Sequence, residues 1–257
     1  MGKKTKSALS PWILFAAGTL LFTSGWLMKS FPILIFVGLA PFFAIVDQGK
    51  EGDRFWNLSE LILAGLAISF FAAHFFEIKF LVAAISQSIA FTLAFVGYAF
   101  AYQNLGNRLG KLTIIIFWLG IEYVLLKIPF RDQTIFLADA LQLQTAWQHW
   151  NVYTGYLGSS LWILTTNLFL YFAVLKEEKI NWVWVSLTVL CIAGPITFSM
   201  LTEGSLVTRL NMLNLYDGEI KLLPKEYLER GELIPRTATW VSGLIILLSL
   251  IKNKTKK

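Results

Sequence analysis

The sequence has few charged residues, two histidines and one cysteine. Charged residues make up 15% of the 257 residues, whereas hydrophobic residues make up 56%. A soluble domain carries about a quarter charged residues, so this chain has too few to cover the surface of a soluble domain of its size. The apolar excess also excludes a disordered or nucleic-acid-binding chain. A single cysteine, Cys191, excludes an internal disulfide and a cysteine-based metal site.

The hydrophobic residues gather in long runs that fit membrane-spanning helices. Such a helix needs about 20 mostly apolar residues to cross a hydrocarbon core of ~30 Å. The segments with this length and composition are about 11–29, 31–47, 59–76, 81–105, 112–128, 155–176, 181–201 and 236–252. The sequence therefore predicts an all-α, polytopic integral membrane protein with about eight transmembrane helices, folded as a single domain over residues 1–257.

The positive charges predict how these helices are oriented. Of the 22 Lys and Arg residues, 13 lie on the side of the two termini and 4 lie in short loops on the opposite side. Cytoplasmic loops carry an excess of Lys and Arg, so we expect both termini in the cytoplasm. The two longer hydrophilic stretches, 129–154 and 202–235, then face outward. Within the second stretch, residues 206–216 have apolar residues near helical spacing, which predicts an amphipathic segment on the outer membrane surface.

Two groups of residues are candidates for a functional site. Glu122 lies inside the fifth apolar segment, where an ionisable group is paired, faces a cavity or has a function. His149 lies in the outer stretch among Trp147, Trp150 and Tyr153, an arrangement typical of an aromatic belt at the membrane interface. The residues predict no catalytic nucleophile, since Cys191 lies mid-span without a neighbouring base and no Gly-x-Ser-x-Gly motif is present. They also predict no metal site and no cofactor.

One stretch resembles a known family. The run Trp150-Asn-Val-Tyr-Thr-Gly-Tyr-Leu-Gly-Ser-Ser-Leu-Trp-Ile-Leu-Thr-Thr-Asn167 is similar to a segment that opens a transmembrane helix in apolipoprotein N-acyltransferases. Two shorter motifs agree with it, Phe31-Pro-x-x-x-Phe-Val-Gly-Leu-Ala-Pro41 and Trp118-Leu-Gly-Ile-Glu-Tyr123. Eight spans with both termini inside also match that family. The resemblance covers residues 11–201 in order, together with the final helix.

The chain departs from that family at its catalytic domain. The family enzymes insert a nitrilase-type domain with a Glu-Lys-Cys triad between the seventh and eighth spans. Here that place is taken by residues 202–235, only 34 residues without a cysteine. Such a loop has no nucleophile to form an acyl-thioester. No catalytic residue is therefore carried over from the family to this sequence.

The resemblance implies a membrane-domain-only relative of these enzymes in the bacterial inner (cytoplasmic) membrane. Such a scaffold would bind phospholipid, or the acyl chains of a bacterial lipoprotein, in an outward-facing groove between helices. The acyl chemistry would come from a partner protein or be lost. The residues predicted to shape this groove are Glu122, Trp147, His149, Trp150, Tyr153 and Asn167.

Two alternatives remain open at this point. One is a retained or partner-assisted acyltransferase that uses His149 or a carboxylate as general base. The other is a small transporter, which would need polar residues along a path through the membrane.

Overall fold

The computed structural model describes residues 9–49, 55–106, 110–128, 133–202, 206–207 and 225–254. Within these ranges the chain folds into helices and has no β-strand. The all-α prediction is confirmed.

Five helical segments are long and apolar enough to cross a membrane. They are Pro32–Gly49, Ile78–Leu105, Leu157–Leu175, Trp182–Leu201 and Gly231–Lys254. Three further apolar helices have 10–17 residues, namely Pro11–Leu27, Leu58–Ala73 and Leu112–Leu126. The eight segments lie where the sequence predicts spans, and within the described residues five of them are long and apolar enough to cross a membrane, so the count of about eight is not confirmed.

The individual elements divide these segments further. The first half consists of α1 (Pro11–Leu27), η1 (Pro32–Leu34), α2 (Ile35–Gly38), α3 (Ala40–Gly49), α4 (Phe55–Ala73), η2 (Ile78–Phe80) and α5 (Leu81–Leu105). The second half consists of α6 (Leu112–Leu126), η4 (Leu137–Leu141), η5 (Thr145–Trp147), α7 (Asn151–Thr154), α8 (Leu157–Leu170), the π-helical turn η6 (Tyr171–Leu175), α9 (Trp182–Leu201) and α11 (Lys225–Lys254).

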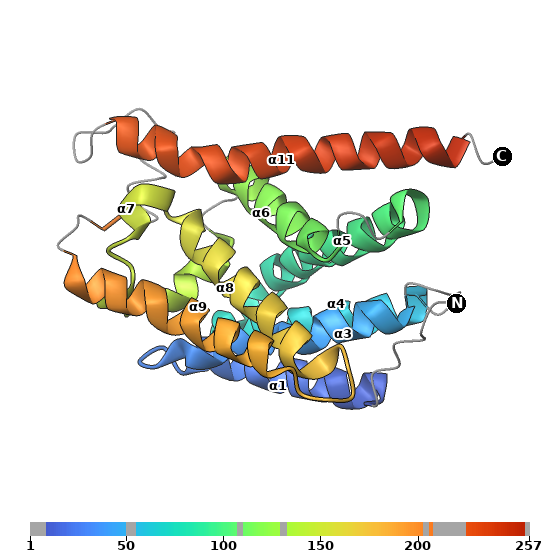
Figure 1. Cartoon of the computed structure of the whole chain (residues 1–257), viewed down its shortest axis with the longest axis horizontal. Helices are drawn as coiled ribbons and strands as arrows, with labels where there is room; N and C mark the ends of the chain where they lie inside the picture. Colours follow the sequence, from blue (N-terminus) through green and yellow to red (C-terminus); the bar gives the residue numbers. More distant parts are fainter. Residues whose placement is uncertain are drawn as a thin grey trace.

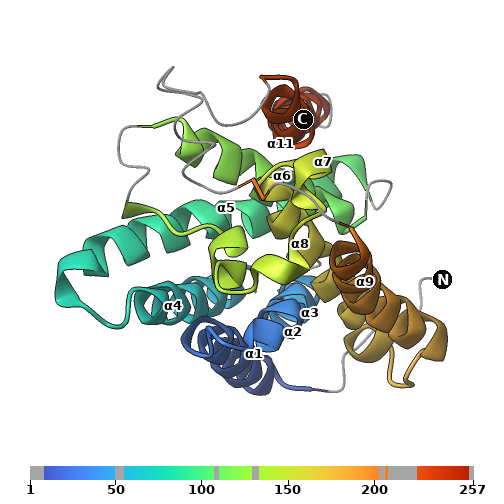
Figure 2. The same ribbon diagram turned by 90° about the vertical axis from the view of Figure 1, so that its left-hand side faces the viewer.

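The helices form a bundle with α8 near its middle and α9 and α11 on its flanks (Figures 1 and 2). The start of α1 and the end of α11 lie at the same end of the bundle, and α7 lies at the opposite end (Figure 1). In the two flanking helices most apolar side chains point away from the protein: Leu201 is 81% exposed and Trp240 is 73% exposed. Exposed apolar surface of this extent requires an apolar environment, which supports a membrane protein.

A row of aromatic rings crosses the core from α1 to α6. Phe22 contacts Phe70 of α4 with ring centroids 6.0 Å apart, and Phe70 stacks on Phe91 of α5 at 5.4 Å. Phe91 in turn stacks on Trp118 of α6 at 4.3 Å. Offset-stacked and edge-to-face pairs of this kind add to the stabilisation from burial. Four helices are thereby held in one packed layer.

Glycine residues allow the first two apolar segments to pack with their backbones in contact. A Cβ atom placed on Gly38 of α2 would lie 2.7 Å from the backbone nitrogen of Phe22 in α1. A Cβ atom on Gly25 of α1 would lie 2.7 Å from the backbone nitrogen of Ile35. Small residues at such contacts are typical of helix packing in membranes, where close van der Waals contact drives association.

The first outer stretch, predicted as the loop 129–154, is partly helical and partly buried. The short helices η4, η5 and α7 lie within it. Leu137 and Leu141 of η4 are fully buried in the main hydrophobic core. A hydropathy pattern does not predict this burial, because polar residues such as Asp139 and Gln142 stand between the buried apolar side chains.

The last helix begins earlier than predicted. The sequence predicts a span at 236–252 after a loop, whereas α11 begins at Lys225. The added turns contain good helix formers such as Leu, Glu, Lys and Arg but are too polar to be recognised as a span. They pack closely on α7, since a Cβ on Gly231 would lie 2.6 Å from the Cα of Gly155. The predicted amphipathic segment 206–216 lies outside the described residues, apart from 206–207.

We expect Gly38→Ala to destabilise the protein by about 1–3 kcal/mol, because a methyl group cannot fit against the α1 backbone without moving it. Thermal unfolding of the purified protein in detergent measures this change. Gly194→Ala on α9 is the matched control, since no atom lies within 4 Å of its added Cβ. Equal melting temperatures for the two variants would contradict the close α1–α2 packing.

Candidate functional site

Asn167, one of the predicted groove residues, is fully buried and joins α8 to a break in the second apolar segment. Its Oδ1 accepts hydrogen bonds from the backbone N–H groups of Leu39 (2.8 Å) and Ala40 (3.0 Å). Its Nδ2 donates to the carbonyl oxygens of Ile35 (3.0 Å) and Ile163 (2.9 Å). Both N–H donors and both acceptor lone pairs of the Asn167 amide therefore take part in hydrogen bonds.

The break that Asn167 fills follows from Pro41. A proline has no N–H, and its ring clashes with the carbonyl four residues before it, here that of Val37. The helix accordingly stops at Gly38 and restarts at Ala40. The backbone groups released by this break lie in an apolar interior, where an unpaired amide or carbonyl is costly. Asn167 therefore has a structural role in this fold.

Glu122 holds a second irregular segment, residues 135–138. The four consecutive backbone N–H groups of this segment each donate to a side-chain oxygen. The acceptors, in order from Ile135 to Ala138, are Gln87 Oε1 (3.1 Å), Asp139 Oδ2 (2.7 Å), Glu122 Oε1 (3.0 Å) and Ser160 Oγ (3.1 Å). These acceptors come from α5, η4, α6 and α8. The segment begins the buried turn η4, so side chains supply the partners that the first N–H groups of a helix lack within the helix.

This arrangement pairs one of the two carboxylate oxygens of Glu122, whereas Oε2 has no hydrogen-bond partner among the described residues. Its side chain is fully buried, and its Oε1 also accepts a hydrogen bond of 3.2 Å from Trp118 Nε1. Trp118 is the last ring of the aromatic row described above. Glu122 thus links the packed layer of helices to the outer segment.

The four aromatic and histidine residues of the predicted groove lie together, on the side of α8 and α9. Trp150 donates from Nε1 to the Trp147 carbonyl (2.9 Å) and its ring meets that of Trp162 edge-on at 5.6 Å. Tyr153 is exposed and its ring lies 6.4 Å from that of Phe198 on α9. Glu122 and Asn167 lie in the core, so the structure separates the six predicted residues into two groups.

His149 forms hydrogen bonds at the end of α9. Its Nδ1 lies 3.1 Å from the carbonyl oxygen of Ser199 and 3.2 Å from that of Thr202, and its backbone N–H donates to Ser199 Oγ. Carbonyl oxygens only accept, so Nδ1 carries the proton and Nε2 is the basic nitrogen in the neutral ring. The last carbonyl groups of a helix have no partner within it, and His149 supplies one.

A groove on another side of the bundle has the shape of a ligand site. Its upper part, of about 400 Å³, lies between α5 and α6 beside η2 and is lined by Lys79, Val82, Ala83, Ser86, Gln87, Leu125, Ile128, Gln133 and Thr134. Its lower part, of about 450 Å³, lies between α5, α6 and α11 and is lined by Ala90, Leu93, Gly97, Phe117, Gly120, Ile121, Val124, Leu125, Thr239, Ser242, Gly243 and Ile246. Leu125 lines both parts, and their other lining residues differ.

The polarity of this groove changes along its length. The upper part contains an ammonium group, two amides and two hydroxyl groups, whereas the lower part is almost wholly apolar. Val82 and Gly97 lie fifteen positions apart on α5, about 22 Å along a helix. No local pattern in the sequence predicts this groove, because its lining residues alternate with exposed and core-facing residues of the same apolar type.

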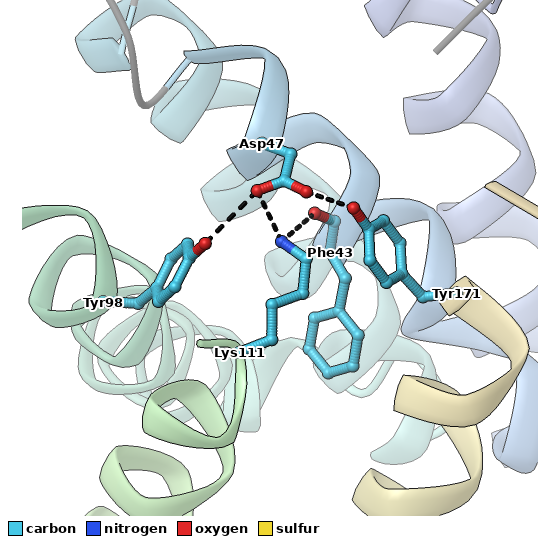
Figure 3. Close-up of polar contacts among 5 residues, drawn as sticks. All are labelled: Phe43, Asp47, Tyr98, Lys111 and Tyr171. Carbon is cyan, nitrogen blue, oxygen red and sulfur yellow. Dashed lines mark hydrogen bonds and ion pairs between the residues drawn. The ribbon is translucent and has the colours of Figure 1, made fainter. Parts of the chain in front are cut away.

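A buried ion pair at the other end of the bundle was also missed by sequence reasoning. Lys111 Nζ lies 2.6 Å from Asp47 Oδ1 and 3.3 Å from the Phe43 carbonyl oxygen, and the hydroxyl groups of Tyr98 and Tyr171 donate to the Asp47 carboxylate (Figure 3). The Lys111 ammonium also lies 4.9 Å and 4.5 Å from the centroids of the two tyrosine rings. The sequence alone places Asp47 and Lys111 at the ends of two predicted spans and does not indicate that they pair.

These contacts tie together α3, α5, the start of α6 and the π-helical turn η6. The Lys111 side chain is 5% exposed and that of Asp47 is 21% exposed. The attraction between the two charges and the hydrogen bonds to the tyrosine hydroxyls and the Phe43 carbonyl offset part of the cost of burying them.

No protein-family model, no curated protein and no solved structure matches this chain. The likeness to apolipoprotein N-acyltransferases therefore rests on the sequence motifs given above and stays a prediction.

We expect Asn167→Ala to lower the free energy of unfolding by several kcal/mol, since it leaves backbone groups at the Pro41 break unpaired at about 1–3 kcal/mol each. Asn104→Ala is the matched control, because Asn104 donates only to the carbonyl four residues before it in its own helix. Denaturation in detergent micelles compares the two. A loss no larger than that of Asn104→Ala would rule out the proposed role of Asn167.

We expect Lys111→Met to cost about 3–5 kcal/mol, because it leaves the Asp47 carboxylate buried without its cation. Lys79→Met should cost at most about 1 kcal/mol, since the ion pair of Lys79 with Glu77 is exposed. Adding Asp47→Asn to Lys111→Met should restore part of the stability, because the buried charge is then removed. The same unfolding assay applies, and the idea fails if the double variant is less stable than Lys111→Met alone.

Proposed function

We propose that this protein binds the acyl chain of a glycerophospholipid in the groove between α5, α6 and α11, as a membrane-domain relative of apolipoprotein N-acyltransferases without their nitrilase-type domain. The observation that carries the proposal is the polarity of the groove. A polar mouth above an apolar channel complements an amphiphile, with its headgroup at Lys79 and its chain along Leu93 and Gly97.

The dimensions of the groove support a chain rather than a compact ligand. The stretch of α5 that lines it covers about 22 Å, which is most of the ~30 Å thickness of a hydrocarbon core. Small residues such as Ala90 and Gly97 keep it open along α5. Apolar lining with a few polar groups at one end is typical of ligand sites.

The proposed orientation places the groove mouth outward. We propose that eight helices cross the bacterial inner membrane with both termini in the cytoplasm, as the Lys and Arg distribution favours. The start of α1 and the end of α11 lie at one end of the bundle (Figure 1), which agrees with an even number of crossings. Lys79 and the 133–138 segment then face the outer leaflet, where the acyl groups of bacterial lipoproteins are attached in the family that the sequence resembles.

In this proposal acyl transfer itself is supplied by a partner protein or is absent. His149 is held at the end of α9 and Glu122 is buried behind η4, so neither lies in the lining of the groove described above. Lipid binding in the groove needs neither residue as a general base.

We expect Ala90→Trp, which fills the middle of the groove, to reduce bound phospholipid at least severalfold. Native mass spectrometry of the protein released from mild detergent counts the lipid that stays bound. Ala193→Trp on α9 is the matched control, because Ala193 is exposed on a flanking helix and outside the groove. Equal lipid retention in the two variants would show that the bound lipid lies elsewhere on the protein.

A separate measurement tests the relation to lipoprotein acylation. The protein is expressed in a strain depleted of its apolipoprotein N-acyltransferase, and lipoprotein N-termini are analysed by mass spectrometry. The proposal expects no triacylated product from this chain alone. Triacylated product that is lost on His149→Ala would instead support a retained acyltransferase.

A further inference from the structure

We propose that Gln87 is the residue that selects ester-linked lipids in this groove, by donating a hydrogen bond from its side-chain amide to an acyl ester carbonyl. This inference rests on the proposed function and adds the contact that would recognise the ligand. Its basis is the position of Gln87 and the way in which its amide is held.

Gln87 lies at the boundary between the polar and apolar parts of the groove. Along α5 it follows Ser86 in the upper lining and precedes Ala90, Leu93 and Gly97 in the lower lining. The ester groups of a glycerophospholipid lie at the same boundary, between headgroup and hydrocarbon. An acyl chain placed in the lower part would therefore bring its carbonyl to the level of Gln87.

The amide of Gln87 is held in one orientation by the backbone of Ile135. Its Nε2 donates to the Ile135 carbonyl, and its Oε1 accepts from the Ile135 N–H at 3.1 Å. A glutamine amide has two N–H donors and two acceptor lone pairs. The pair with Ile135 uses one of each, which leaves one N–H for a ligand. Because the side chain is already fixed, binding costs little further side-chain entropy.

Two polar side chains in the lower lining are engaged within the protein. The Thr239 hydroxyl donates to the carbonyl oxygens of Pro235 and Gly120, at 3.0 and 3.3 Å. The Ser242 hydroxyl donates to those of Ala238 and Ile116, at 2.8 and 3.3 Å. A hydroxyl has one hydrogen to donate, so both are committed to backbone carbonyls. Gln87 is therefore better placed to donate to an ester than either of them.

The experiment compares two lipids that differ only in this acceptor. Dioleoyl phosphatidylcholine has ester carbonyls, and its dioleyl ether analogue has the same headgroup and chain length without them. Each is titrated into the delipidated full-length protein, and the two Kd values are measured by native mass spectrometry. We expect the ester lipid to bind about fivefold more tightly, as one additional hydrogen bond implies.

Two variants assign this preference to Gln87. Gln87→Met keeps the length of the side chain but removes the donor, and should bring the ratio of the two Kd values close to one. Gln133→Met is the matched control, because Gln133 lines the exposed mouth of the same groove, and should keep the ratio of the wild-type protein. A preference that survives Gln87→Met would overturn the assignment.

The wild-type comparison decides the question even if Gln87→Met fails to fold. If the wild-type protein binds the two lipids with equal Kd values and Ala90→Trp weakens the binding of both, the role of Gln87 is overturned and the groove remains the lipid site. Binding of both lipids that Ala90→Trp does not weaken would overturn the proposed function and this inference together. An ester preference abolished by Ala90→Trp and by Gln87→Met, and kept by Gln133→Met, supports both.

Discussion

The need to pair every backbone amide in an apolar interior governs this structure. A helix pairs its own backbone groups, but the chain leaves regular helix at buried places that include the Pro41 break and the 135–138 segment. An unpaired group costs several kcal/mol in a hydrocarbon environment. Side chains from distant helices supply the missing partners, Asn167 at the first place and Glu122 among those at the second. The positions of α2, α3, α6 and α8 relative to one another depend on these bonds.

This constraint changes how the polar residues of the spans are interpreted. A carboxylate or amide within an apolar run indicates either a functional site or a buried structural partner. For Asn167 the geometry favours the second interpretation, because its donors and lone pairs are all used by backbone. Glu122 likewise serves as an acceptor for the outer segment. Gln87 differs from both, because it holds the same segment and also lines an open groove.

The groove depends on the meeting of helices that are far apart in the chain. α5 and α6 form one wall, and α11 closes the lower part from more than a hundred positions later. Close contacts place α11 there, with Gly231 against Gly155 and Ser242 bonded to the Ile116 carbonyl. The same three helices carry exposed apolar side chains such as Leu93, Val124 and Trp240, so the groove lies at the surface of the bundle.

The sequence by itself determined the helical fold, the approximate positions of the apolar segments and the location of Glu122 within one of them. Length and hydropathy are properties of each local segment, and they determine whether a helix formed by that segment can span a bilayer. Only the tertiary structure decided which side chains meet. The Asp47–Lys111 pair joins segments 64 positions apart in the sequence, and the early start of α11 and the inward turn of η4 depend on contacts with other helices. Packing between elements that are far apart in the sequence selects these partners, so no pattern within a single segment predicts them.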